Sequence, residues 1–483
     1  MQAFELLLII VGTLYLLFHR TLNNRLKLPY VVGGLIVVLL LHLIFEAFRW
    51  QMIPAYLIWT TALFIAFNRP KEKSSTTGRA LKSVGLIILL FLGFLLPSVL
   101  PVFHLPKPSG PYTVGTTDIY IDLERDEPIT ADTTDTRKIM VKAWYPSNDS
   151  NGEFDPYVDQ GGRIGFAKKY GLPPFMLNYL DQVDTYVYRD TRVADESFPV
   201  IIFSHGYNSK ANGYYALLSE IVSQGYVVFA VNHTYESTGT TFPDGTVETF
   251  DYEYARNIEA DTWEIITPVI EAFESGHTFE ERHPIVREAL TTYFGRDIVE
   301  RWAMDLASVA DQLSSWNSFG MFKGRLNLSK VGALGHSRGG GAAGELTLID
   351  NRIKAGANLD GVQWGQIVTR SFNKPFLFLS SDWPEDHENL IPHAYVNKSR
   401  SIFYECLLLN SGHSNFMDIP FMVPVQALSM AGNIDPNLAT DITTELLTSF
   451  FDKHLKSIDL NLQSISSEYE LLELTIHEEN TLR

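Results

Sequence analysis

The sequence predicts a two-part chain, in which an all-α membrane region precedes an α/β domain with a mostly parallel sheet and helices on both faces. The first 105 residues contain four long apolar runs, and the remainder alternates between strand-like runs and helical stretches. Such alternation is typical of a parallel sheet, whose ligands bind at the carboxyl ends of the strands. The strand-like runs begin with 138–146, which alternates like an antiparallel strand, and later ones end at Ser204, Val231, Gly335, Asp360, Ser380 and Asn410.

The apolar runs of the amino-terminal region cover residues 3–18, 29–48, 52–68 and 83–103. Each is about as long as a helix needs to be to cross a bilayer. A cleaved signal peptide would explain only the first run, so we expect a multi-pass membrane anchor of about four helices over residues 1–105. Because the first and third runs are short, a three-span or re-entrant arrangement remains an alternative.

Basic residues between the apolar runs predict the orientation of this region. The first connection carries Arg20, Arg25 and Lys27, the second carries only Arg49, and the third carries Arg69, Lys71, Lys73, Arg79 and Lys82. Connections enriched in Lys and Arg are the cytoplasmic ones. We therefore expect a protein of the cell membrane whose amino terminus, and everything after residue 103, lie outside the cytoplasm.

The charge of the chain divides at the same boundary. Residues 1–105 hold nine Lys and Arg against three Asp and Glu, a net +6, which leaves −24 for the rest of a chain whose formal net charge is −18. An acidic domain disfavours nucleic acid and anionic lipid surfaces as partners. The one cysteine, Cys406, lies in an apolar run and excludes an intrachain disulfide, and no Cys and His spacing is typical of zinc, so we expect no metal and no cofactor.

The most specific motif is the G-x-S-x-G pentapeptide at 335–339, which directly follows a strand-like run and contains Ser337. This arrangement is typical of a nucleophile elbow, a strained strand-to-helix turn where glycines on both sides of the serine avoid collisions with the neighbouring backbone. Small residues at 340–344 would let the following helix begin close to the sheet. Ser337 is therefore the predicted nucleophile.

Candidate partners for Ser337 follow it in the order acid and then histidine, each after a strand-like run. His413 is the predicted base, because a loop histidine flanked by small polar residues can reach over the turn and accept the serine proton. Asp360 and Asp382 both follow strand-like runs, and either one could orient the imidazole. Four other histidines are weaker candidates for the base. His387 and His393 lie in a polar connection, His454 in a predicted helix and His477 in the acidic tail.

An oxyanion-binding turn is predicted upstream of the elbow. The apolar run 199–203 leads into a His-Gly turn at 205–206, so the backbone amides of Tyr207 and Arg338 are the predicted donors to the oxyanion. The further candidates to line the substrate pocket are His205, His233 and Trp364. For His233, a loop histidine that only hydrogen-bonds its surroundings is an equally good interpretation.

Four segments resemble the platelet-activating factor acetylhydrolase family of α/β-hydrolases, in its plasma and intracellular type II branch. They are Phe203-Ser204-His205-Gly206, Gly335-His336-Ser337-Arg338-Gly339-Gly340, Asn358-Leu359-Asp360-Gly361 and His413-Ser414-Asn415-Phe416-Met417-Asp418. The resemblance covers residues 112–455 and implies an α/β-hydrolase fold with Asp360 as the triad acid. Two departures bear on the substrate: Arg338 stands where the family commonly has an aromatic residue, and 251–303 is a longer, acidic insertion.

These observations predict a hydrolase domain over 112–455 and an acidic tail over 456–483 that lies on the surface. The insertion at 251–303 is expected to form two or three amphipathic helices, with breaks at Pro268 and Pro284, that cover the site as a cap. A solvated structural insertion is the alternative.

The predicted function is hydrolysis of carboxylic esters, of short-chain acyl or phospholipid-like type, through a Ser337-His413-Asp360 triad and an acyl-enzyme. Bacterial carboxylesterases and polyester hydrolases share the elbow pattern, so ester hydrolysis follows more firmly than a phospholipid substrate. Two alternatives remain, an acyltransferase that delivers the acyl group to a membrane or cell-envelope alcohol, and a non-catalytic scaffold with a hydrolase fold. Acyl chain length, alcohol and oligomeric state do not follow from the sequence.

Overall fold

The computed structural model describes the chain apart from residues 69–75, 261, 371–372, 384–389, 396–400 and 479–483, so His387 lies outside the described residues. It separates into two compact units. The helical unit comprises Met1–His104, Phe175–Val183 and Phe421–Val425, and the sheet unit comprises Leu105–Pro174, Asp184–Pro420 and Gln426–Arg483.

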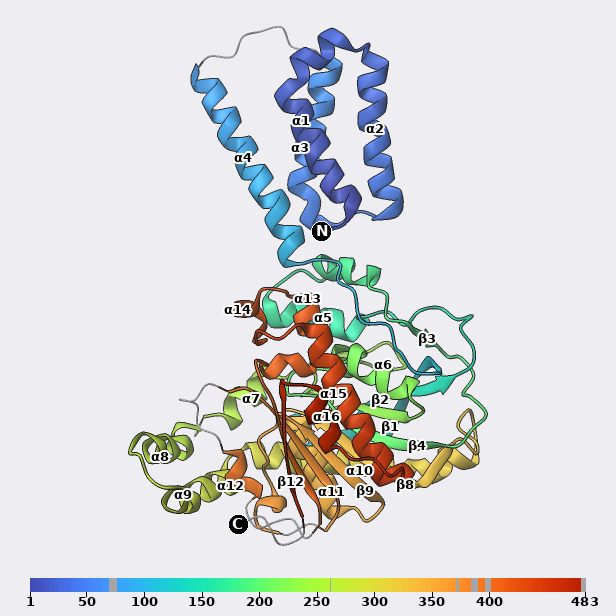
Figure 1. Cartoon of the computed structure of the whole chain (residues 1–483), viewed down its shortest axis with the longest axis vertical. Coiled ribbons are helices and arrows are strands. Elements are labelled where there is room, and N and C mark those ends of the chain that lie inside the picture. Colours follow the sequence, from blue (N-terminus) through green and yellow to red (C-terminus); the bar gives the residue numbers. More distant parts are fainter. Residues whose placement is uncertain (69–75, 261, 371–372, 384–389, 396–400, 479–483) are drawn as a thin grey trace. The chain divides into compact units, whose positions relative to one another are not determined.

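The helical unit contains four long helices (Figure 1). They are α1 (Ala3–Arg25), α2 (Leu28–Phe45), α3 (Ile53–Asn68), which follows the short turn η1 (Trp50–Met52), and α4 (Thr76–Val99). All four apolar runs therefore form helices, and each of the four, with η1 counted as part of the third (Trp50–Asn68), is long and apolar enough to cross a membrane. Trp59 of α3 is buried and its indole N–H donates to the carbonyl of Leu8 in α1 at 2.5 Å, which joins the two helices.

Polar side chains meet at one end of this bundle. Arg49 forms an ion pair with Glu5, and both side chains are fully buried. Arg49 also donates to the carbonyl of Leu100 at 3.1 Å, and the amide of Phe4 donates to Glu46 at 2.7 Å. The amino terminus, the α2–α3 connection and the residues after α4 therefore share one end of the bundle, and the cation of that connection is neutralised by a carboxylate.

The sheet unit is built on ten strands in the order β12-β11-β10-β9-β8-β4-β5-β2-β1-β3. They are β1 (Thr113–Asp126), β2 (Thr136–Ser147), β3 (Val187–Arg189), β4 (Phe198–Ser204), β5 (Val227–Asn232), β8 (Leu326–His336), β9 (Ile353–Leu359), β10 (Phe376–Ser381), β11 (Phe403–Leu408) and β12 (Leu472–His477). The six strands from β5 to β11 are parallel, whereas β2 and β12 pair antiparallel with β5 and β11. The mostly parallel sheet and the antiparallel strand near residue 140 are thus confirmed. A separate hairpin pairs β6 (Gly239–Thr241) with β7 (Val247–Thr249).

Helices cover both faces of this sheet, as the fold class predicts (Figure 1). The helices that follow residue 105 are α5 (Gln160–Tyr170), α6 (Tyr215–Ser223), α7 (Tyr252–Ile258), α8 (Thr262–Glu274), α9 (Phe279–Thr292), α10 (Gly295–Ser318), α11 (Arg338–Ile349), α12 (Ile391–Tyr395), α13 (Ile419–Met422), α14 (Gln426–Ser429), α15 (Pro436–Phe451) and α16 (Gln463–Glu468). Trp302 of α10 and Ala342 of α11 share one hydrophobic core with Val200 of β4. Phe203, an odd number of positions further along β4, faces the opposite side, where its ring contacts Tyr214 at a centroid distance of 5.0 Å.

The insertion at 251–303 forms α7, α8 and α9 and the first turns of α10. Pro268 and Pro284 lie inside α8 and α9, so the predicted helix breaks at these prolines are wrong. The chain turns at Gly276, whose φ of 67° suits glycine, and Thr278 then caps the start of α9. Local capping chemistry therefore decides where these helices end.

The chain after residue 456 is not the surface appendage that its acidity predicts. It forms α16 and then β12, which pairs with β11 as the edge strand of the sheet. Leu472 is buried and the next residue, Glu473, is exposed, so the acidic residue belongs to the outer face of a strand. Cys406 of β11 is a core residue, as predicted, and burial raises the pKa of its thiol.

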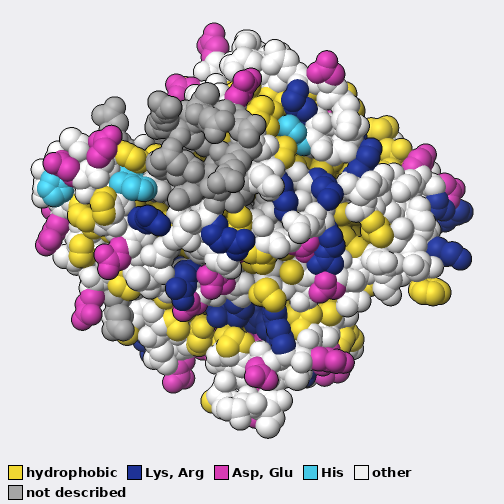
Figure 2. Space-filling model, turned by 90° about the horizontal axis from the view of Figure 1, so that it is seen from below, with side chains coloured by type: hydrophobic (Ala, Val, Ile, Leu, Met, Phe, Trp, Pro, Cys, Tyr) yellow, Lys and Arg dark blue, Asp and Glu magenta, His cyan; other side chains and the backbone are white. Residues whose placement is uncertain are grey.

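Charges of both signs occur on the face of the molecule shown in Figure 2. Lys, Arg, Asp and Glu side chains are interspersed there with hydrophobic ones. Although the chain has a net negative charge, this face does not form one continuous acidic patch.

Candidate active site

Ser337 lies at the turn between β8 and α11, at the carboxyl end of the parallel strands. Its φ of 57° and ψ of −127° are a strained conformation for a residue with a side chain. Its amide donates to the carbonyl of Leu359 at 2.9 Å, which fastens the turn to β9. A Cβ atom on Gly335 would collide with the carbonyl of Gly339, so the turn requires glycine there. The backbone at Ser337 has the shape that a nucleophile elbow requires.

Asp360 follows β9 directly and contacts His413, which lies in the loop after β11. The Nδ1 atom of His413 is 2.6 Å from Oδ2 of Asp360. Ser381 donates to the same carboxylate from its amide and from its hydroxyl, both at 2.8 Å, and the indole of Trp383 donates at 3.0 Å. These donors come from the end of β10 and fix the carboxylate in place, so that it can orient the imidazole ring.

Asp382, the alternative acid, has a different environment. Its side chain is exposed, and its carboxylate accepts a hydrogen bond from the amide of Asn410 at 2.7 Å. It therefore fastens the end of β11 to the end of β10. Of the two candidate acids, Asp360 is the one whose carboxylate contacts the imidazole of His413.

His336 connects three parts of the site, and sequence analysis did not assign it a role. The amide of Gly206 donates to the hydroxyl of Tyr214 at 2.9 Å, and this hydroxyl lies 2.9 Å from Nδ1 of His336. The Nε2 atom of His336 lies 3.1 Å from the carbonyl of His413. Burial, followed by the nearby His413, lowers the pKa of His336, so its ring is neutral and carries its proton on Nε2.

The same chain of hydrogen bonds places the predicted oxyanion turn beside the elbow. A Cβ atom built on Gly206 would lie 3.2 Å from the Cβ atom of Ser337. Gly206 and Tyr207 follow β4, which is the neighbour of β8 in the sheet. The hydrogen bonds through Tyr214 and His336 therefore tie this turn to the elbow and to the loop of His413. The sequence does contain one signal for this linking role of His336, which is its position directly before the nucleophile in the motif.

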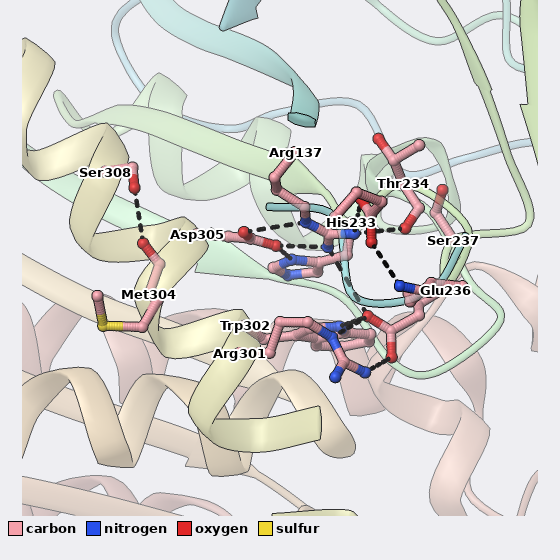
Figure 3. Close-up of polar contacts among 12 residues, drawn as sticks. Arg137, His233, Thr234, Glu236, Ser237, Arg301, Trp302, Met304, Asp305 and Ser308 are labelled. Atoms are coloured by element: carbon pink, nitrogen blue, oxygen red, sulfur yellow. Dashed lines mark hydrogen bonds and ion pairs between the residues drawn. The ribbon is translucent and has the colours of Figure 1, made fainter. Parts of the chain in front are cut away.

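His205 and His233 do not line a pocket, because both side chains are fully buried. His205 bonds through Nδ1 to the carbonyl of Gly206 at 2.7 Å. The imidazole of His233 stacks on Trp302 at 4.0 Å between centroids and lies 2.8 Å from Asp305 (Figure 3). It also lies 2.9 Å from the hydroxyl of Ser204. The interpretation of His233 as a hydrogen-bonded loop histidine fits the structure, and the prediction that the two histidines line the pocket is wrong.

His233 belongs to a buried network of charges that lies behind the oxyanion turn (Figure 3). Arg137 bonds to Asp305 at 2.7 Å and to Glu127 at 2.9 Å. Burial by itself would raise the pKa of Asp305, but the Arg137 guanidinium outweighs this effect and holds it below its usual value. Glu236 forms a further ion pair with Arg301. Because Ser204 ends β4, this network holds the strand that carries the oxyanion turn.

Comparison with known proteins identifies the family. The chain matches the family described as platelet-activating factor acetylhydrolase, isoform II, over residues 100–471. The chain belongs to this family. Among its relatives, the platelet-activating factor acetylhydrolase of Cavia porcellus is 25% identical over 389 residues, which cover 76% of this chain and 81% of the relative. The enzyme of the same name from Canis lupus familiaris is 24% identical over 374 residues, covering 73% and 77%.

A solved structure has the same fold. The ferulic acid esterase from Streptomyces cinnamoneus superimposes with a TM-score of 0.60 at 24% identity, covering 77% of this chain and 99% of that one. The α/β-hydrolase fold that the family resemblance implies is thus confirmed. Family and fold together make this chain a carboxylic ester hydrolase.

In this member of the acetylhydrolase family, Trp364 and Arg338 lie next to each other beside the elbow. The ring of Trp364 stacks on Tyr293 at 4.7 Å between centroids. The guanidinium carbon of Arg338 lies 5.6 Å from the centre of the Trp364 ring. Trp364 is largely buried, so its contribution to the site is to enclose the side chain that follows the nucleophile.

Proposed function

We propose that this esterase uses Ser337 as nucleophile, His413 as general base and Asp360 as the acid that orients the imidazole. The observation that carries the proposal is the 2.6 Å contact between Nδ1 of His413 and Oδ2 of Asp360, at the carboxyl edge of the sheet where Ser337 occupies a strained turn. A nucleophile, a base and an orienting acid are the parts that acyl transfer through serine requires.

The proposed reaction has two steps. The Oγ atom of Ser337 attacks the ester carbonyl carbon while Nε2 of His413 accepts the serine proton, which then passes to the leaving alcohol. The backbone amides of Tyr207 and Arg338 stabilise the oxyanion of each tetrahedral intermediate. Water, deprotonated by His413, attacks the acyl-serine, and His413 returns the proton to Oγ of Ser337 as the acid is released. Asp360 stabilises the imidazolium that forms in both steps.

Replacement of the nucleophile tests this proposal. We expect Ser337→Ala to lower kcat/KM for 4-nitrophenyl acetate by roughly 10⁴-fold or more, and to abolish labelling by a fluorophosphonate probe. Ser318→Ala, at an exposed position near the end of α10, is the matched control and should retain both activities. Hydrolysis and labelling that persist in Ser337→Ala would show that another residue is the nucleophile.

The proposed substrates are esters with short acyl chains, including phospholipid-like esters. Support comes from the relatives, which are named platelet-activating factor acetylhydrolases and, in Arthroderma benhamiae, a probable 1-alkyl-2-acetylglycerophosphocholine esterase. Release of acetate from such a lipid, compared with release of a long-chain acid from a diacyl lipid, measures the preference. Transfer of the acyl group to an added alcohol in preference to water would instead indicate an acyltransferase.

We propose that the four helices anchor the enzyme in the cell membrane with the sheet unit outside. In support, the amino terminus, the α2–α3 connection and residue 100 meet at one end of the bundle, and Arg20, Arg25 and Lys27 belong to the other end.

The natural cysteine, Cys406, is buried and can be replaced by alanine. In that background, an impermeant maleimide applied to intact cells should label Ser329→Cys in the sheet unit and should not label Asn24→Cys at the end of α1. The opposite pattern of labelling would reverse the orientation.

A further inference from the structure

The side chain of Arg338 is surrounded by aromatic rings. Its guanidinium carbon lies 5.7 Å from the ring centre of Tyr207, 5.5 Å from Tyr293, 5.0 Å from Phe294 and 5.6 Å from Trp364. These rings come from the oxyanion turn, from the junction of α9 and α10, and from the loop after β9. A cation is therefore held within an aromatic enclosure by the residue that follows the nucleophile in the chain.

This cation has no partner of opposite charge among the residues that the structure describes. Its Nη1 atom is buried and makes no hydrogen bond. Two other arginines of the sheet unit differ in this respect, because Arg137 contacts Glu127 and Asp305, and Arg301 contacts Glu236. Contacts with aromatic rings do not replace the hydrogen bond that the buried Nη1 atom loses with water, so a hydrogen-bond acceptor would still be favourable there.

A second buried polar group beside Arg338 also lacks a partner. The hydroxyl of Tyr207 is buried without a hydrogen bond, although native structures pair nearly all such groups. Burial, and then the nearby Glu236, raises the pKa of Tyr207, so the hydroxyl keeps its proton and acts as a donor. Two unused donors, one of them cationic, thus belong to neighbouring side chains.

The start of α10 adds to the positive potential at this point. A Cβ atom on Gly295, the first residue of α10, would collide with Nη1 of Arg338, so the guanidinium lies against this helix end. The amino-terminal end of a helix carries partial positive charge, which disfavours a neighbouring cation and favours an anion. An acceptor with negative charge would satisfy Arg338, Tyr207 and the helix end together.

We propose that Arg338 and Tyr207 form a subsite for an anionic oxygen group, a carboxylate or a phosphate, carried by the ester substrate close to its reacting carbonyl. The proposal deepens the proposed function, because it rests on Ser337 as the nucleophile and names the chemistry that the neighbouring side chain recognises. Arg338 is the specificity-determining residue, since its guanidinium can bind such a group through two N–H donors and the Tyr207 hydroxyl supplies a third.

The experiment compares matched esters on the full-length enzyme in detergent. One pair places the charge on the acid, mono-4-nitrophenyl glutarate against 4-nitrophenyl pentanoate. The other pair places it on the alcohol, 2-acetoxyethyl phosphate against 2-methoxyethyl acetate. For each pair the measured quantity is the ratio of kcat/KM for the anionic ester to that for the neutral ester, which cancels any effect common to both.

We expect this ratio to exceed unity by about 10- to 100-fold in one of the two pairs, as charge-assisted hydrogen bonds of about 1.5–3 kcal/mol imply. The pair that shows the preference tells whether the anion belongs to the acid or to the alcohol. Arg338→Met should bring the ratio close to unity, and Tyr207→Phe should lower it to a smaller degree. Arg282→Met is the matched control, because Arg282 also lies over an aromatic ring, Phe273, at 4.5 Å, and it should keep the wild-type ratio.

Two results would overturn the subsite. One is a wild-type ratio near or below unity in both pairs, and the other is a preference that Arg338→Met leaves intact. Failure of the proposed function is separately visible, because Ser337→Ala would then still hydrolyse the neutral esters, whatever the ratios are. If Arg338→Met fails to fold, Tyr207→Phe still tests the subsite, because it retains the aromatic ring and removes only the hydroxyl. The same ratio of kcat/KM values is measured for this variant.

Discussion

Replacing Arg137 by methionine tests whether burial or geometry determines the strength of an ion pair in this enzyme. Arg137 and Asp305 are both inaccessible to solvent, and their closest atoms are 2.7 Å apart. The same guanidinium bonds to Glu127 at 2.9 Å and to the carbonyl of Thr234 at 3.0 Å. Methionine would fill much of the space but leave the buried Glu127 without its cation, whereas Asp305 would keep its ion pair with Arg125.

The expected cost follows from that environment. Removal of one partner from a buried pair typically destabilises a protein by about 3–5 kcal/mol, because the remaining charge stays desolvated. Since a folded protein is stable by only about 5–15 kcal/mol, Arg137→Met should place the sheet unit close to unfolding. Arg192 offers a matched control, because it also lies 2.7 Å from its partner, Asp195, although the two side chains are 76% and 65% exposed. Arg192→Met should cost less than about 1 kcal/mol.

The measurement is urea-induced unfolding of the full-length protein in detergent, followed by tryptophan fluorescence. We expect a large fall in the midpoint for Arg137→Met and a small one for Arg192→Met. Because Asp305 has a lowered pKa in the folded wild-type protein, its contribution is present above its unfolded pKa of about 3.9 and is lost as the pH falls toward its folded value. Equal shifts of the midpoint in the two variants would refute the argument that burial decides the cost.

Three further predictions concern the site, a buried carboxyl group and the helical unit. Asp360→Asn should lower kcat for 4-nitrophenyl acetate by roughly 10³–10⁴-fold and Asp382→Asn by less than about threefold, and similar losses would contradict the assignment of the acid. Burial raises the pKa of Glu345 to about 7, so its contribution to stability is complete below its unfolded pKa of about 4.3 and is lost as the pH rises through 7. At pH 8 the free energy of unfolding of Glu345→Gln should therefore exceed that of the wild type by about 3 kcal/mol, so its urea midpoint should be higher. A lower midpoint would contradict this. Arg49→Met leaves Glu5 buried without its cation and should lower the thermal stability of the helical unit in detergent, whereas Arg25→Met at the end of α1 should not.

Local patterns in the sequence were sufficient where the structure depends on neighbouring residues. The four apolar runs became four helices because length and hydropathy decide whether a segment crosses a bilayer. The strands and the elbow at Ser337 were predictable because alternating and glycine-rich patterns directly constrain the backbone. The prediction of a surface tail after residue 456 is wrong, because it rests on acidic composition alone. The alternation of apolar residues in 472–476 marks the strand β12.

Only the tertiary structure decided between residues with the same local pattern. Asp360 and Asp382 both follow strands, and β10, which precedes Asp382, is the direct neighbour of β11, which precedes the loop of His413. The folded chain nevertheless brings Asp360 to the imidazole of His413, 53 positions further along the chain, at 2.6 Å. His233 and Arg338 show the same limit. Each lies in a turn after a predicted strand, yet one is enclosed in a charge network and the other in aromatic rings supplied by distant segments. A sequence determines which backbone shapes and chemical groups are present, whereas burial and pairing depend on contacts between remote segments, and these exist only in the folded chain.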